Sequence, residues 1–372
     1  MKRNRTIDVF RTIAILSVLI YHFYVLCNYP YAEYKLLNRI ISTGGETGVT
    51  LFFIISGFGI FVSLQRMDTD GSLTYRSFLK KRFLRILPQY YLGLGVLLLI
   101  TSNAQYLNRK GLFDIITHAI FLHNWFPSTH GSINGVLWSL GTIFQFYFIA
   151  LFIYKLIKKS NGILVYICSI SLVIILKYFI YHYVFKYFAI EPSYYFIYGR
   201  QIYTALDNFI AGMIIADLLI NKKFDNIKSR IYGTVFIASS IFAVFWLWQT
   251  ETKSPYVDSL FGYSWHSVLC IILSVIIFSA CNIKVNFKGI ISRICFIIAK
   301  YQYGTYIWHF VIASTLISSS SWFNKISGSH FIVFTVIMLG ICNVAGYFST
   351  IVLEGIDYVK AFKGLKEQLL HE

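Results

Sequence analysis

The stretch "RTIDVFRTIAILSVLIYHF", residues 5–23, has the length and apolar character of a membrane span, yet it contains ionisable side chains. Arg11 lies one turn inside the apolar run and His22 lies near its far end. Charged side chains inside a span cost at least ~2.5–3.5 kcal/mol each on insertion scales, so they usually mark function. On a helix these two would lie about 20° apart around the axis and ~16 Å apart along it. They therefore share one face of the predicted helix.

The composition of the whole chain favours a bilayer as its solvent. Of its 372 residues, 57% are hydrophobic and 13% are charged, whereas a soluble domain has about 25% charged residues. The mean hydropathy is +0.63. Too little polar surface remains to cover a water-soluble core of this size, and the 19% of aromatic residues suits the belts at membrane interfaces.

We therefore predict an all-α, polytopic membrane protein with ten transmembrane helices. The predicted spans cover residues 7–27, 45–65, 84–102, 136–157, 162–185, 202–220, 231–249, 264–281, 301–319 and 330–352. Segment 112–126 is apolar but short, and we predict an interfacial or re-entrant helix there. Residues 1–352 would form one transmembrane domain, followed by a short basic cytoplasmic tail over 353–372.

The distribution of charge predicts the orientation. The formal net charge is +17. If successive predicted spans cross the membrane in alternating directions, most of the 33 Lys and Arg residues fall on the side of the amino terminus. By the positive-inside rule both termini are cytoplasmic. Topology thus accounts for most of the charge, which argues against nucleic-acid binding. The six cysteines form no CxxC pair, so we expect neither a disulfide framework nor a metal site.

Two groups of buried ionisable residues stand out on the predicted helices. Asp8 precedes Arg11 by three residues and can pair with it, either as an interfacial anchor or as part of a site. His22 and His309 are imidazoles deep within the first and ninth spans, and we interpret both as functional.

Two further motifs lie at the ends of spans. In "GGETGVTLFFIISGFGIF", residues 44–61, Glu46 is either a solvated loop acid or the group that orients the imidazole of His22. In "FLKKRFLRILPQYY", residues 78–91, Arg82 and Arg85 share a helix face and can bind one phosphate. The alternative for these arginines is an ordinary positive flank that meets anionic lipid.

Together with "LWSLGTIFQFYF" at 137–148 and "YQYGTYIWHF" at 301–310, these stretches resemble, in order, the acyltransferase-3 family of integral membrane acyltransferases. The resemblance covers nearly the whole chain. It rests on Asp-x-x-Arg with a later His, Phe-Phe-x-x-Ser-Gly-Phe, Arg-x-x-Arg before a Pro, Trp-Ser-Leu before Phe-Tyr, and Tyr-x-x-His. The matching residues are Asp8, Arg11, His22, Phe52, Phe53, Ser56, Gly57, Phe58, Arg82, Arg85, Pro88, Trp138, Ser139, Leu140, Phe146, Tyr147, Tyr306 and His309.

The resemblance implies an enzyme that moves an acetyl group from cytoplasmic acetyl-CoA to a hydroxyl of a cell-surface or lipid-linked polysaccharide. It also implies a multi-pass protein of a cell membrane, which we expect to be the bacterial cytoplasmic membrane. The family's usual Glu in the Trp-Ser-Leu element would fall at Ile143, where this chain has no acid. We expect that role to be absent or to be supplied by Glu46.

The resemblance also suggests how the motifs would act. The phosphates of coenzyme A would lie on Arg82 and Arg85, and its pantetheine arm would pass Arg11 with its partner Asp8. His22 would then act as general base on the acceptor hydroxyl, or alternatively form an acyl-histidine.

Other residues would support this reaction. Glu46 would orient His22, and His309 or Tyr306 would stabilise the oxyanion or position the sugar. Trp138 lies at the predicted outer interface and is a candidate substrate-binding residue. The outer-loop residues Trp125, His123 and His130 would either stack on sugar rings or form an interfacial belt.

A competing interpretation is a transporter or flippase of a glycan precursor, which would also use buried His and Arg but no acyl donor. No inverted repeat or pair of broken helices supports it. A structural or sensory membrane protein would leave His22 and His309 unexplained. The sequence leaves the glycan, the acyl length and the oligomeric state open.

Overall fold

A computed structural model describes residues 4–100, 106, 108–251, 253–283, 289–319, 326 and 328–354. Within these residues the chain is all helical and contains no strand, which confirms the predicted fold class. Its helices are α1 (Arg5–Leu26), α2 (Lys35–Ser42), α3 (Gly44–Thr69), α4 (Tyr75–Ile100), α5 (Arg109–Ala119), α6 (Pro127–His130), α7 (Trp138–Lys159), α8 (Gly162–Tyr178), α9 (Phe185–Tyr187), α10 (Tyr195–Tyr198), α11 (Leu206–Ile220), α12 (Ser229–Trp248), α13 (Leu260–Asn282), α14 (Ile290–Ser318) and α15 (Ser329–Glu354).

Eight helical segments of the described residues are long and apolar enough to cross a membrane. They contain α1, α3, α4, α7, α8, α12, α13 and α15, and match eight of the ten predicted spans. The other two predicted spans, 202–220 and 301–319, coincide with α11 and α14. Helix α11 has only 15 residues, and α14 has 29 but carries Arg293 and Lys300 in its first half. The total of ten spans therefore stays a prediction.

Helix α11 is short and lies mostly inside the molecule. Nearly all of it is buried, and it packs on α3 through two glycines. A Cβ at Gly57 would lie 1.9 Å from the carbonyl oxygen of Phe209, and one at Gly212 would lie 1.7 Å from that of Ile54. Only glycine allows the two backbones to approach so closely. Gly57 and Gly212 thus form the close contact between α3 and α11.

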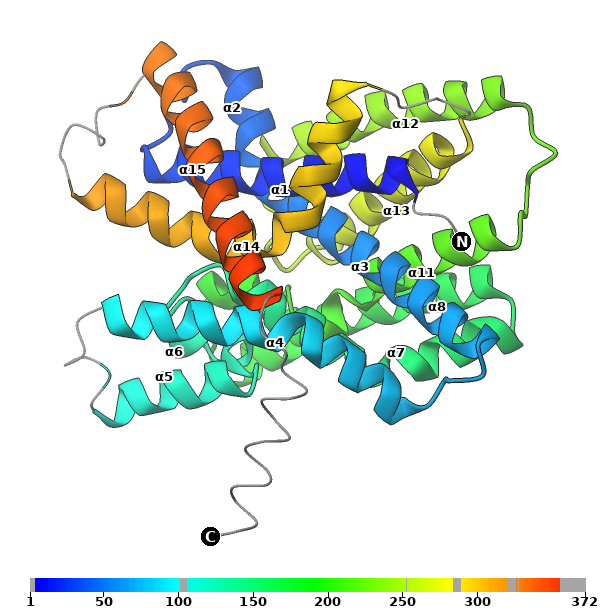
Figure 1. Ribbon diagram of the computed structural model, residues 1–372, viewed down its shortest axis with the longest axis horizontal. Coiled ribbons are helices and arrows are strands. Elements are labelled where there is room, and N and C mark those ends of the chain that lie inside the picture. Colours follow the sequence, from blue (N-terminus) through cyan, green and yellow to red (C-terminus); the bar gives the residue numbers. More distant parts are fainter. Residues whose placement is uncertain are drawn as a thin grey trace, which may run out of the picture.

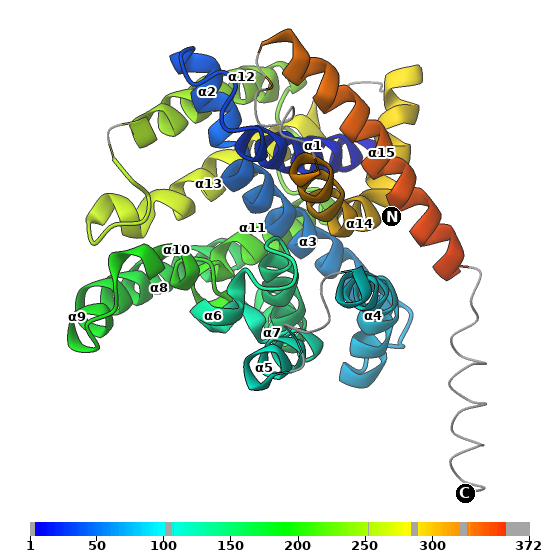
Figure 2. The ribbon, with the colours of Figure 1, turned by 90° about the vertical axis from the view of Figure 1, so that its left-hand side faces the viewer.

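The central helices place their charged ends on one side. In Figure 1, α1, α3, α7, α8 and α12 run broadly across the view, with the amino terminus on the right. The ends of α3 and α7 meet there, since the hydroxyl of Tyr154 donates to Asp68 Oδ2 at 2.7 Å. Figure 2 shows α1 and α3 in the middle of the bundle. Of the predicted tail 353–372, residues 355–372 lie outside the described residues.

The segment predicted as an interfacial or re-entrant helix forms α5 and a 3-10 turn, His123–Trp125. Phe121 separates them with a left-handed φ of 59°. The burial pattern of helix α5 is the reverse of that in a soluble protein. Its apolar residues Leu112 and Ile116 are exposed, whereas its polar residues Asp114 and His118 are buried. An apolar outer face of this kind suits contact with lipid.

Candidate functional site

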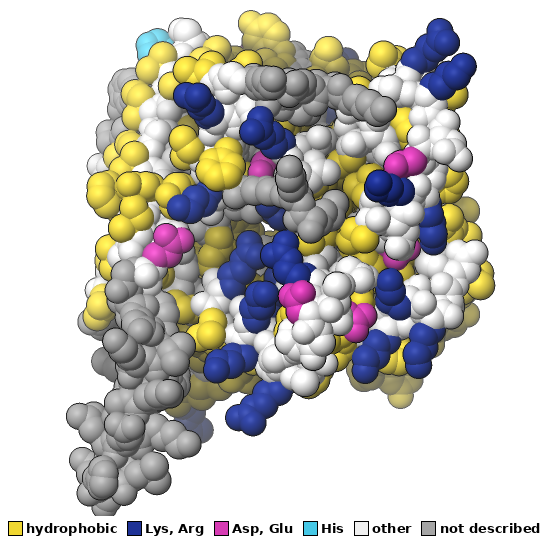
Figure 3. All heavy atoms as spheres, turned by 45° about the vertical axis from the view of Figure 1, so that its right-hand side comes forward, with side chains coloured by type: hydrophobic (Ala, Val, Ile, Leu, Met, Phe, Trp, Pro, Cys, Tyr) yellow, Lys and Arg dark blue, Asp and Glu magenta, His cyan; other side chains and the backbone are white. Residues whose placement is uncertain are grey.

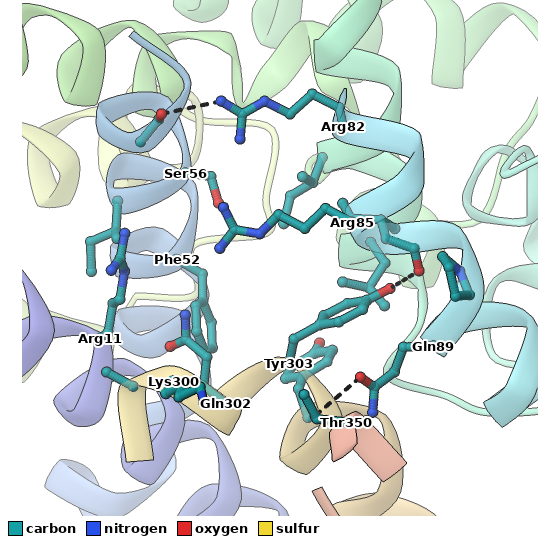
Figure 4. A pocket seen from close by; sticks show the side chains of 18 of the residues that line it. Arg11, Phe52, Ser56, Arg82, Arg85, Gln89, Lys300, Gln302, Tyr303 and Thr350 are labelled. Carbon is teal, nitrogen blue, oxygen red and sulfur yellow. Dashed lines mark hydrogen bonds between the residues drawn. The ribbon is translucent and has the colours of Figure 1, made fainter. Parts of the chain in front are cut away.

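A cavity of about 390 Å³ opens between α3, α4, α7, α14 and α15, with Arg11 of α1 in its wall. It brings together Arg11, Arg82, Arg85 and Tyr306, four of the residues that the sequence suggested for the site. Figure 3 shows a face of the molecule on which Lys and Arg gather around a hollow. Figure 4 shows Arg82 and Arg85 extending from α4 toward α3, with Arg11 on the opposite side of the space. The cavity is therefore strongly cationic.

Exposure falls from the mouth of this cavity to its inner end. Arg85 and Lys300 are exposed, and the carboxylate of Glu354 also lies at this exposed part of the lining. Tyr306 and Ser139 are each only 5% exposed. A ligand entering the cavity would thus meet exposed cations first and buried hydroxyl groups last.

Arg82 is a buried cation that no carboxylate of the described residues neutralises. Only 6% of it is exposed, and its guanidinium lies over the rings of Phe78 and Tyr147, 5.4 and 5.9 Å from their centroids. Nη2 donates to the carbonyl oxygen of Gly59 at 3.2 Å (Figure 4), whereas the buried Nε has no hydrogen-bond partner within the described part of the chain. Buried charges are costly unless paired. Arg82 is therefore suited to an incoming anion.

Arg11 is held by the partner that its spacing predicts. Its Nη1 lies 3.0 Å from Asp8 Oδ1, and Asp8 is 3% exposed. The pair is confirmed. Arg11 also lines the cavity, so it lies where a bound ligand could contact it.

The inner end of the cavity is a fixed set of hydrogen bonds. Tyr306 donates its single hydroxyl hydrogen to the carbonyl oxygen of Val136 at 2.8 Å, because a carbonyl can only accept. Ser139 Oγ lies 2.8 Å from the same hydroxyl and must then be the donor in that bond. The hydrogen of Tyr306 is thus already used. In this arrangement Tyr306 connects α14 with the start of α7, and its expected role at the oxyanion or the sugar stays a prediction.

Beyond Tyr306 lies a pair of imidazoles. The rings of Tyr306 and His309 are 5.4 Å apart, and His309 Nε2 lies 2.9 Å from His22 Nδ1. His309 Nδ1 lies 2.7 Å from the carbonyl oxygen of Tyr306 and must carry a hydrogen to bond it. With both rings neutral, His309 Nε2 accepts a hydrogen from His22 Nδ1. The lone pair of His22 Nε2 is then free to take a proton.

Glu46 lies in a different network from the one expected. Its carboxylate accepts hydrogen bonds from Arg200 Nη2 and from the hydroxyl of Tyr256 at 2.6 Å, and lies 3.3 Å from His266 Nε2. Lys177 continues the network, with Nζ 3.3 Å from His266 Nδ1. The prediction that Glu46 orients His22 is therefore corrected: the ring nitrogen that contacts His22 belongs to His309.

Sequence reasoning missed most of this network. Lys177 and His266 are ionisable residues within predicted spans, which is the signal that would have drawn attention to them. Arg200 and Tyr256 lie outside the predicted spans, and no pattern in the sequence connects them with Glu46.

The outer aromatic residues divide into covered and open ones. Trp138 is 6% exposed and lies beneath the Arg200 guanidinium, 4.8 Å from its ring centroid, with His130 stacked on it at 5.7 Å. Trp125 is 44% exposed. His123 is fully buried and stacks on His118 at 4.1 Å, so its ring offers no face to a sugar. The sugar-stacking prediction for His123 is therefore wrong, because the loop folds inward over it.

Burial also sets the charge of these loop histidines. It lowers the pKa of His123 to about 3 and that of His130 to about 4. Both rings are neutral at pH 7.

Comparison with known proteins identifies the family of this chain. The profile of the acyltransferase-3 family, described as an acyltransferase domain, matches residues 4–347. The chain belongs to the acyltransferase-3 family. No solved structure matches the chain.

Several curated proteins share this acyltransferase-3 region. "Putative O-acetyltransferase SACOL0978" of Staphylococcus aureus (strain COL) is 28% identical over 341 residues, covering 83% of this chain and 50% of that protein. "Peptidoglycan O-acetyltransferase OatA" of Listeria monocytogenes serovar 1/2a (strain ATCC BAA-679 / EGD-e) is 28% identical over 158 residues, covering 39% of this chain and 23% of that protein. The chain spans about half the length of the Staphylococcus aureus relative.

Within the acyltransferase-3 pattern, Ile143 stands where an acid was expected, and the structure places it in the cavity wall. That wall is apolar at this point. Glu46 is not among the residues that line the cavity. It therefore does not supply the missing acid there, which corrects the second expectation for Glu46.

Proposed function

We propose that this chain is a membrane-embedded O-acetyltransferase that uses acetyl-CoA from the cytoplasm and acetylates a hydroxyl of a cell-surface polysaccharide. The observation that carries the proposal is the cationic cavity whose buried end, at Tyr306, contacts the His309–His22 pair. Relatives named as peptidoglycan O-acetyltransferases support a saccharide acceptor.

The cavity suits the chemistry of the donor. Coenzyme A is a polyanion attached to a thin chain of amides that ends in a thiol. Arg82, Arg85 and Lys300 would bind its phosphates near the mouth. Gln302 also lines the cavity and has a buried Oε1 without a partner among the described residues, which is suited to accept an amide N–H of the arm.

The reaction then follows from the direction of the hydrogen bonds at the imidazole pair. His22 Nε2 removes the proton from the acceptor hydroxyl, and the oxygen attacks the thioester carbonyl. The carbon–sulfur bond breaks, and the proton passes from the imidazolium to the departing thiolate. His309 accepts the Nδ1 hydrogen of His22 throughout and so keeps Nε2 directed at the acceptor.

The proposal includes a topology. With α11 and α14 as the two additional spans, the chain would cross the membrane ten times, so both termini would lie on one side. The positive flanks on that side support the cytoplasm as its location. The cavity mouth would then face acetyl-CoA, and the opposite end of the bundle would face the polysaccharide. We propose the bacterial cytoplasmic membrane as its location.

The test uses purified protein in detergent with two measurements. Acetyl-CoA should raise the melting temperature, since ligand at 1,000 times its Kd stabilises by about 4 kcal/mol. A peptidoglycan fragment should then cause release of free coenzyme A thiol and gain acetyl ester. A transporter would show neither result, and absence of both would refute the proposal.

A further inference from the structure

A second cavity, of about 340 Å³, lies beside α9 and α10. Figure 2 shows α8, α9 and α10 together at one edge of the molecule. No step of the proposed reaction uses this cavity, and it shares no lining residue with the cationic one. Its important lining residues are Tyr181, His182, Phe185, Lys186, Tyr195 and Asp258.

Three aromatic rings form one rigid wall of this cavity. Tyr181 and Phe185 are buried, at 2% and 3% exposure. Each stacks with Tyr195 at a centroid distance of 4.5 Å, with interplanar angles of 26° and 25°. Tyr181 also donates its hydroxyl to the carbonyl oxygen of Tyr195 at 3.1 Å. The rings are therefore fixed before any ligand arrives.

The polar groups of the cavity come from elements far apart in sequence. His182 Nδ1 lies 3.0 Å from Asp258 Oδ2, with side-chain exposures of 45% and 33%. Tyr263 donates its hydroxyl to the other carboxylate oxygen of Asp258. His182 belongs to a π-helical turn, Phe179–Val184, a rare conformation that is frequent at functional sites. Lys186 adds an exposed cation.

This combination matches the chemistry of a sugar ring. A pyranose has an apolar face of C–H groups, which packs on aromatic rings, and hydroxyls around its edge that both donate and accept. A carboxylate, an imidazole and an ammonium supply the matching partners. A site for an anion alone would not hold Asp258 in its wall, and a site for an acyl chain would not hold any of the three polar groups.

Contacts between aromatic rings and a guanidinium connect the wall of this cavity with the inner end of the cationic cavity. Phe196 follows Tyr195 on α10, and the Arg200 guanidinium lies 3.6 Å from its ring centroid. The same guanidinium lies over Trp138, the neighbour of Ser139 at the floor of the cationic cavity.

We propose that the cavity at α9 and α10 is a saccharide subsite that holds a sugar of the acceptor polysaccharide. This inference rests on the proposed function for the identity of the acceptor.

The experiment measures saccharide binding separately from acetyl-CoA binding. Full-length protein in nanodiscs of neutral lipid is titrated with chitotetraose, and ligand-observed NMR reports binding. Asp258→Asn and Tyr195→Ala should each weaken binding at least 10-fold. Tyr187→Ala should not, because Tyr187 is 83% exposed on the same segment and does not line the cavity. Asp258→Asn keeps the size of the side chain, so it preserves the test if Tyr195→Ala fails to fold.

The outcomes separate the two proposals. Saccharide binding that depends on Asp258, combined with neither a thermal shift nor thiol release from acetyl-CoA, would support the subsite and refute the acetyltransferase. A thermal shift with acetyl-CoA, combined with saccharide binding that is absent or equal in wild type and both variants, would refute the subsite alone. Loss of saccharide binding when anionic lipid replaces neutral lipid would assign the cavity to lipid headgroups and would also refute it. A glycan strand and a lipid-linked precursor share the sugar chemistry, and comparing chitotetraose with a lipid-linked disaccharide distinguishes these two sources.

Discussion

His22 and His309 are 287 positions apart in the sequence, yet their ring nitrogens Nδ1 and Nε2 lie 2.9 Å apart. The carbonyl oxygen of Tyr306 fixes the direction of this bond, since it binds His309 Nδ1 and leaves only Nε2 to accept from His22. One basic nitrogen, His22 Nε2, remains. The pair thus resembles a general base with its orienting partner, in which an imidazole takes the place usually held by a carboxylate.

The first prediction concerns His22 as the base. His22→Gln should lower the turnover number by about 10²–10⁴-fold, the usual contribution of a positioned base. Acetyl-CoA should still raise the melting temperature of the variant, because the donor cavity does not include His22. A variant that binds donor and transfers acetyl at the wild-type rate would exclude His22 from proton transfer.

The second prediction concerns His309 as a positioning residue. His309→Asn should lower the turnover number by roughly 10-fold and shift the acid limb of the pH–rate profile, because His22 loses the acceptor for its Nδ1 hydrogen. The Michaelis constant for acetyl-CoA should stay near the wild-type value. His330→Asn is the matched control, because His330 is an exposed histidine of α15. An unchanged pH profile in His309→Asn would contradict the assignment.

The third prediction concerns the cationic cavity. Arg85→Ala should weaken acetyl-CoA binding about 10-fold or more, since charge-assisted contacts to phosphate contribute roughly 1.5–3 kcal/mol each. Arg76→Ala is the control, because Arg76 is also exposed on α4 but does not line the cavity. Isothermal titration at two salt concentrations measures both variants. Equal losses in the two would indicate general surface charge instead of a binding site.

The fourth prediction concerns Glu46. Glu46→Gln should lower the free energy of unfolding by about 1–3 kcal/mol, because Arg200 and its neighbours lose a partly buried carboxylate. The acid limb of the pH–rate profile should not move, since Glu46 does not bond His22. Thermal unfolding and the pH profile of one preparation provide both readouts. A shifted profile with unchanged stability would restore the earlier interpretation of Glu46.

The sequence predicted those contacts of the site that join residues close together on one helix. The pair Asp8–Arg11 follows from a spacing of three on one helix, and the structure confirms it. The membership of Arg82 and Arg85 in one cavity also follows from their shared helix face. The contact between His22 and His309 depends on how α1 packs against α14, which no spacing reveals.

The same reasoning applies to the fold. Long apolar helices such as α1, α3 and α13 are visible in composition alone, because lipid demands a continuous apolar surface. Helix α11 is harder to classify, since it has only 15 residues and its neighbours bury most of its surface. The partners of Glu46 lie on three other segments and became known only from their packing.

The last prediction concerns pH and the inward-folded loop. Burial lowers the pKa of His130 to about 4 and that of His123 to about 3, whereas an unfolded histidine titrates near about 6.5. The unfolded state therefore binds more protons between these values, so stability rises with pH across this window and is lost as pH falls from about 6.5 toward 4. The loss from His130 alone should be on the order of 3 kcal/mol at pH 4. His130→Phe keeps a ring on Trp138 and should reduce the drop in melting temperature between pH 7.5 and pH 5. If wild type and His130→Phe lost stability equally on acidification, the pH sensitivity would have to come from other groups, because removing a buried neutral histidine removes the proton uptake that drives the effect.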